Sequence, residues 1–150
     1  MESRHLLLAQ LEAQHGLVRA LLAEQGGAAT TAAPAPAASA HAEVARLLEH
    51  LASCGRELLR LAGRGGDPVA DPWSAVEDLV RGLEEADLDQ GPGTPLEPGV
   101  PAEGTTLRSL LAGHTGHLAW HLGQAARIRR EAGLAPMPGW PQDSQRPLDR

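Results

Sequence analysis

Three of the chain's seven histidines, His114, His117 and His121, lie in a single predicted helix over residues 105–132. At about 100° per residue they share the apolar stripe of that helix with its leucines. A buried imidazole without a hydrogen-bond partner costs about 1–3 kcal/mol, so three of them make poor packing residues. We therefore expect these side chains to bind something polar.

The chemistry that this pattern favours is metal binding. His117 and His121 are spaced i, i+4, so their rings project from adjacent turns and can share one metal ion. A third ligand has to come from another helix, and His50, at the edge of the apolar stripe predicted for residues 40–62, offers one. Three protein nitrogens leave one coordination position open, as in catalytic sites. We expect a divalent ion, zinc first, with nickel, iron or manganese as alternatives.

Two more residues on the same helix lie one turn from these ligands. His114 precedes His117 by one turn and is an alternative third ligand, a partner that orients a ligand, or a substrate-facing group. Gln124 follows His121 by three residues, and its amide either hydrogen-bonds a ligand imidazole or lies on the helix surface. The arginines that follow are expected to be solvated, at the helix end that favours positive charge: Arg127, Arg129 and Arg130.

The single cysteine, Cys54, follows His50 by one helical turn. Its commonest role would be that of a small buried hydrophobic side chain. The alternative is a thiolate beside the metal, with its pKa lowered by the ion. The remaining histidines, His5, His15 and His41, are expected at the surface and outside the site.

Four amphipathic segments separated by Gly- and Pro-rich breaks must position these residues. Asp71-Pro72 is a strong helix start, Ser39 is a candidate N-cap, and Gly26-Gly27 is a candidate C-cap. No segment alternates with period 2, so no sheet is expected. The predicted helices cover residues 2–24, 40–62, 73–87 and 105–132.

These segments indicate an all-α four-helix bundle over residues 1–133. The Ala/Pro-rich residues 28–38 and the Gly/Pro-rich residues 88–104 are expected to be long surface connections. Residues 134–150 contain three Pro-containing turns and are expected to form an extended or disordered tail.

Composition excludes several classes of function. The net charge is −6, all 13 basic residues are arginine, and Phe and Tyr are absent, which argues against nucleic-acid binding. One cysteine excludes an internal disulfide framework and a cysteine-rich zinc module. No apolar run approaches the roughly 18 residues of a membrane span, and the N-terminus does not read as a signal peptide. We expect a cytoplasmic protein that does not bind membranes.

The fourth segment resembles the last bundle helix of the DinB/YfiT-like superfamily. The resemblance rests on H-x-x-x-H-x-G-Q, which runs here from His117 to Gln124, and on residues 43–59, which look like the family's second helix and align His50 with its first metal ligand. Trp120 stands where the family usually has an aromatic residue. The resemblance implies a DinB-like bundle, often homodimeric, with a divalent metal held by His50, His117 and His121.

Members with assigned activities include mycothiol-dependent maleylpyruvate isomerases and low-molecular-weight thiol S-transferases. The resemblance therefore implies a metal-dependent transferase or hydrolase that activates a thiol or water toward a small-molecule substrate, such as a low-molecular-weight thiol. One alternative is a non-catalytic metal-binding bundle of the stress response. Another is a helical interaction protein whose histidines bind nothing and whose alanine-rich faces serve dimerisation.

Overall fold

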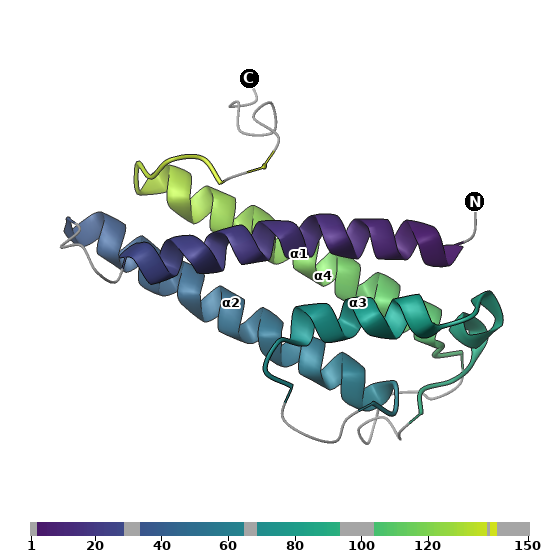
Figure 1. Cartoon of the computed structure of the whole chain (residues 1–150). Coiled ribbons are helices and arrows are strands. Elements are labelled where there is room, and N and C mark those ends of the chain that lie inside the picture. Colours follow the sequence, from purple (N-terminus) through teal and green to yellow (C-terminus); the bar gives the residue numbers. More distant parts are fainter. Residues whose placement is uncertain (1–2, 29–33, 65–68, 94–103, 138, 141–150) are drawn as a thin grey trace.

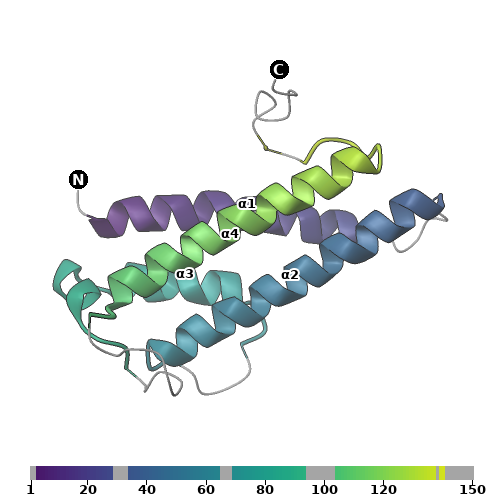
Figure 2. The same cartoon turned by 180° about the vertical axis from the view of Figure 1, so that it is seen from behind.

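The computed structural model describes residues 3–28, 34–64, 69–93, 104–137 and 139–140. Within these residues the chain is all-α, as expected, with four helices packed against one another and no strand. α1 and α2 each pack against both α3 and α4 (Figure 1), and the reverse view shows the long diagonal run of α2 beside α4 (Figure 2). The elements are α1 (Ser3–Ala28), α2 (Ala35–Leu61), α3 (Pro72–Gly82), the 3-10 helix η1 (Glu85–Asp89) and α4 (Leu107–Glu131).

The sequence signal at the start of α3 is confirmed, and the structure adds a cap at the start of α4. The Asp71 carboxylate accepts hydrogen bonds from two backbone N–H groups of the first turn of α3, with Pro72 at the first helical position. Thr106 caps α4 and forms a reciprocal capping box with Ser109. At the other end of α4, Gly133 has φ +69°, which suits glycine and ends the helix where it was predicted to end.

The two boundaries predicted from glycine and serine alone are wrong. α1 continues through Gly26 and Gly27, and neither glycine adopts the positive φ of a helix C-cap. A glycine costs a helix only about 1 kcal/mol, so it does not force an end. α2 begins at Ala35 after Pro34, and Ser39 lies inside the helix instead of capping it. Proline is tolerated in a first turn and alanine favours helix, so residues 35–38 are helical and not an extended connection.

The third helix is shorter than its predicted range. α3 ends at Gly82, and the chain re-forms a short 3-10 helix, η1, in which Glu84 and Asp87 make a reciprocal capping box. Leu88 in η1 is fully buried, so this part of the predicted surface connection packs on the core. Residues 94–103, the rest of that connection, lie outside the described part of the chain.

The hydrophobic core is built mainly from leucine and valine, as a chain without Phe or Tyr requires. Trp73, on α3, is its one fully packed large aromatic side chain among the described residues. Most of the apolar residues at helical spacing in the four segments are buried, but Leu22, which falls on the apolar stripe of α1, is 43% exposed. The core residues buried in the predicted stripes include Leu7, Leu11, Val18, Leu21, Val44, Leu48, Leu51, Leu58, Val76, Val80, Leu111, Leu118 and Ile128.

A polar network is buried between α1 and α3, and it contains His15, which was wrongly expected at the surface. His15 is completely buried, and its Nδ1 lies 2.8 Å from Oε1 of the buried Glu77. Glu77 also accepts hydrogen bonds from Arg19 at 3.0 Å and Arg81 at 3.2 Å. Desolvation acts to raise the pKa of Glu77, but the hydrogen bonds from His15 and Arg19 lower it overall. These hydrogen bonds thus stabilise the ionised Glu77 carboxylate in the interior.

The end of α4 is tied to the residues that follow it. Arg129, wrongly expected to be solvated, is 1% exposed and forms an ion pair with Glu24 at 2.8 Å. It also donates to the backbone carbonyl of Ala135, at 2.7 Å from one terminal nitrogen. Met137 is buried against the core, so the first residues beyond Gly133 pack on the bundle. Of the predicted tail, residue 138 and residues 141–150 lie outside the described part.

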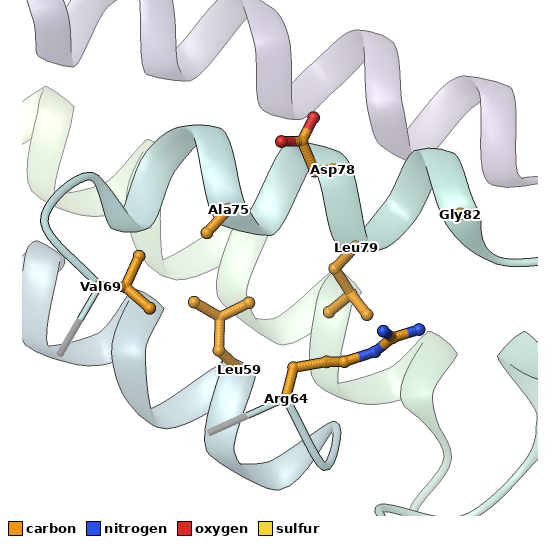
Figure 3. A pocket seen from close by; sticks show the side chains of 7 residues that line it. All are labelled: Leu59, Arg64, Val69, Ala75, Asp78, Leu79 and Gly82. Atoms are coloured by element: carbon orange, nitrogen blue, oxygen red, sulfur yellow. The ribbon is translucent and has the colours of Figure 1, made fainter. Parts of the chain in front are cut away.

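One hollow of about 370 Å³ lies between the end of α2 and α3 (Figure 3). Leu59, Val69 and Leu79 line it with apolar surface, and the Arg64 side chain runs along one wall. None of the predicted site residues lines it. No helix in the described ranges combines the length and apolar character that crossing a membrane requires.

Candidate metal centre

The packing of α2 against α4 brings together the histidines that the sequence singled out. His50 on α2 faces His117 on α4, and their Nε2 atoms are 2.9 Å apart. His50 is exposed and His117 is half-buried, so the pair lies at the edge of the α2–α4 contact. This position follows from the sequence, because His50 sits on the rim of its helix's apolar stripe.

Cys54 belongs to the same cluster. Its Sγ lies 3.7 Å from Nε2 of His50 and 3.8 Å from Nε2 of His117. These three atoms all lie within 4.8 Å of one another, and together they form a His/Cys/His group that could hold a metal ion. Of the two roles considered for the thiol, this placement supports the one beside the metal. The signal in the sequence was the i, i+4 spacing of His50 and Cys54.

His121, the third predicted ligand, is not part of this His/Cys/His group, but its ring packs beside it. Its ring centroid is 4.9 Å from that of His50 and 4.5 Å from that of His117. His121 Nδ1 is 2.7 Å from Oε1 of Gln124, an oxygen that only accepts, so Nδ1 carries the proton and Nε2 keeps its lone pair. That Nε2 is buried and meets no hydrogen-bond partner among the described residues. The Nε2 atom of His121 is thus fixed in orientation, and its lone pair has no hydrogen-bond partner in the described part of the chain.

Burial shifts the pKa values of two members of this group, His117 and Cys54. Burial, followed by the charges of His121 and His50, lowers the pKa of His117 and favours its neutral, ligand-competent form. Burial raises the pKa of the Cys54 thiol, so without a metal the sulfur keeps its proton at neutral pH. A bound cation would act in the opposite direction and favour the thiolate.

The remaining candidates flank the cluster on both sides. Trp120 is 60% exposed, with ring centroids 6.2 Å from His117 and 4.7 Å from His121. His114, one turn before His117, is buried, and its ring meets that of His15 edge to face at 6.5 Å. His114 is not part of the His/Cys/His group, so its proposed use as a third ligand receives no support from the geometry.

We expect His114 to make the fold sensitive to acid. Burial, then the charges of His15 and His117, lowers its pKa from 6.5 to about 4. The unfolded chain binds this proton more readily than the folded chain does. The contribution of His114 to the free energy of unfolding is therefore fully present above pH 6.5 and is lost as the pH falls toward 4. The shift corresponds to about 3 kcal/mol of unfolding free energy. Burial lowers the pKa of His15 too and adds in the same direction.

Urea denaturation of metal-free protein, followed by Trp fluorescence between pH 7.5 and 4.5, measures this effect. In His114→Leu the decline over that range should be clearly shallower than in the unmodified protein. In His5→Leu, which changes an exposed histidine, the decline should be unaltered. Equal pH dependence in all three proteins would contradict a role for His114.

Fold and site together define an all-α four-helix protein with a His/Cys/His cluster between its second and fourth helices. No family model matches the chain, and no curated protein or solved structure compared with it does so either. The resemblance to the DinB/YfiT-like superfamily therefore stays a prediction carried by the motif from His117 to Gln124.

Proposed function

We propose that the protein is a divalent-metal-dependent enzyme of the DinB-like class, with His50, His117 and His121 as ligands. The observation that carries this proposal is the spacing of the His50, His117 and Cys54 donor atoms across the α2–α4 contact. Around a tetrahedral zinc, two imidazole nitrogens lie about 3.3 Å apart, and a nitrogen and a thiolate sulfur about 3.6 Å apart. The sulfur lies 3.7 and 3.8 Å from the two nitrogens, close to this spacing, and the nitrogens are 2.9 Å apart, the shorter distance of an N–H···N hydrogen bond that a metal ion would replace.

His121 supports the proposal as the third nitrogen. Its Nε2 is buried without a partner in the described part of the chain, and its ring packs on both other imidazoles. A metal ion would satisfy this nitrogen, whose orphaned state otherwise costs about 1–3 kcal/mol. Gln124 fixes the tautomer and the ring orientation, as outer partners of metal-binding histidines do.

The residues around such a site would have different roles. When bound, the ion supplies Lewis acidity that lowers the pKa of a thiol or water in its open position. His50 is exposed and leaves the cluster accessible to a small substrate, while His121 closes it on the inner side. Trp120 lies against the rings of His117 and His121 on the outer side of α4.

A test of this function is a turnover screen with zinc-loaded protein, low-molecular-weight thiols with electrophilic acceptors, and small hydrolysable esters. We expect activity that disappears in the His50→Ala, His117→Ala double variant. It should persist in His41→Ala, which removes another histidine of α2. Activity that survives in the double variant would contradict the proposed centre.

A second candidate is a non-catalytic metal-binding bundle of the stress response. It is favoured by the position of Cys54, whose sulfur can supply a fourth donor and close the site, as in structural zinc sites. Cys54→Ser separates the two. If the site is closed, Cys54→Ser should weaken zinc binding about as much as the loss of a ligand histidine. If the site is an open three-histidine site, Cys54→Ser should keep most of the zinc affinity.

Gln124→Ala is expected to lower zinc affinity by roughly 10- to 100-fold, because it releases the tautomer and ring orientation of His121. Competition with a chromophoric chelator measures the change. Gln10→Ala removes an exposed glutamine from α1 and should leave the affinity unchanged. If Gln124→Ala binds zinc like the unmodified protein, His121 is not among the ligands.

A further inference from the structure

A groove of about 350 Å³ lies between α2 and α4 beside the His/Cys/His group. His50 and Cys54 form part of its wall, so a molecule in the groove would contact two residues of the His/Cys/His group. Its volume is at the lower end of the range of roughly 300–1,000 Å³ for ligand pockets. The groove therefore suits a small molecule.

The walls of this groove are apolar and contain no cationic side chain among the described residues. Leu58, Leu61 and Leu110 supply most of the apolar surface. The one charged lining residue, Glu57, is negative and is held by Arg60 at 2.6 Å. The hollow of Figure 3 differs, since Arg64 lines it. An anionic ligand would lose its hydration in the groove without gaining a positive partner.

One buried polar side chain in the wall lacks a hydrogen-bond partner among the described residues. His114 is 7% exposed, and neither of its ring nitrogens bonds to any of the described residues. Nε2 is buried, whereas Nδ1 is accessible, so Nδ1 is the nitrogen that a hydrogen-bonding group of a ligand in the groove can reach. With its pKa lowered to about 4, the ring is neutral at pH 7, and Nδ1 can act as its donor or as its acceptor.

We propose that the groove binds a small uncharged molecule, with an aliphatic part against Leu58, Leu61 and Leu110 and a hydrogen-bonding group on His114. The proposal rests on the proposed function for one point, that the bound molecule is presented to a metal held in part by His50, which lines the groove. It gives that site a substrate class: uncharged and largely aliphatic.

Hexanamide and hexanoate provide a matched pair of probes, equal in size and different in charge. Ligand-observed NMR titrations at pH 8 are made with protein as purified and after chelator treatment. We expect hexanamide to bind at least about tenfold more tightly than hexanoate, since the groove offers the anion no cation. Arg64→Ser identifies any hexanoate bound in the hollow of Figure 3, because that binding disappears in the variant.

His114→Leu keeps the bulk of the side chain and removes its hydrogen bond, so hexanamide affinity should fall about tenfold. His41→Leu should leave it unchanged, and circular dichroism verifies that both variants fold. If His114→Leu does not fold, hexanamide should still shift the His114 ring signals in the unmodified protein. Equal affinity for amide and carboxylate, or unchanged ring signals at saturation, would overturn the proposal.

These experiments distinguish failure of the groove proposal from failure of the proposed metal centre. Discrimination between the probes by chelator-treated protein supports the groove whether or not the protein binds a metal. Zinc binding without discrimination between the probes overturns the groove and leaves the metal centre standing.

Discussion

His117→Ala should weaken zinc binding by roughly a hundredfold or more, because loss of a ligand exceeds the roughly 10- to 100-fold effect of losing an outer partner. His117 is central to the cluster: its Nε2 lies 2.9 Å from that of His50 and 3.8 Å from the sulfur of Cys54. Its ring also packs on His121 at 4.5 Å. Its removal leaves His121 as the one remaining proposed ligand on α4.

The affinity is measured by chelator competition at pH 7.5 on protein without a histidine tag. His41→Ala is the matched control, since it removes a half-buried histidine of α2 that bonds only Gln25 among the described residues. Both variants should unfold at urea concentrations similar to that of the unmodified metal-free protein. Equal zinc affinity in His117→Ala and His41→Ala would show that the cluster does not bind the metal.

Glu77→Ala should destabilise the fold by about 3 kcal/mol, within the range for breaking a buried charged contact. Glu77 is 6% exposed and accepts from His15 in the interior as well as from Arg19 and Arg81. Without it the Nδ1 of fully buried His15 has no partner, which alone costs about 1–3 kcal/mol. The substitution also leaves a cavity between α1 and α3.

Urea denaturation at pH 7.5 gives the free energy of unfolding for this comparison. Glu12→Ala is the control: Glu12 also binds Arg81, at 2.7 Å, but the pair is exposed. Its loss should cost less than about 1 kcal/mol. Glu77→Gln, which keeps an acceptor for His15, should fall between the two. A Glu77→Ala protein as stable as Glu12→Ala would contradict the role of the buried network.

The fold was largely predictable because the apolar stripes of the four helices follow the helical period closely. The boundary set by the side-chain cap at Asp71 was also predictable, since a cap is a local interaction. Boundaries judged from glycine and serine alone failed at Gly27 and Ser39, where helix continues in spite of the local signal. At these two positions the small free-energy penalty of one residue does not outweigh the stability of the surrounding helix.

Two members of the His/Cys/His group, His50 and His117, were predicted as ligands, but the geometry of the group was not. Helical spacing placed His117 and His121 on one face, the edge of the second predicted helix offered His50, and the family resemblance pointed to the same three residues. Spacing within one helix cannot show which donors of two helices meet, so the closeness of Cys54 to both His50 and His117 emerged only from the α2–α4 packing. The network around His15 was missed for the same reason, since its partner Glu77 lies 62 residues away.

The most direct test of the metal centre is elemental analysis of untagged protein, loaded with zinc and freed of excess ion by gel filtration. The cluster of His50, Cys54 and His117, with His121 behind it, predicts about one zinc per chain. The His50→Ala, His117→Ala double variant should hold almost none. Acidification should strip the ion, because ligand imidazoles bind only when neutral. Unmodified protein that retains no zinc, or a double variant that retains as much, would contradict the metal centre.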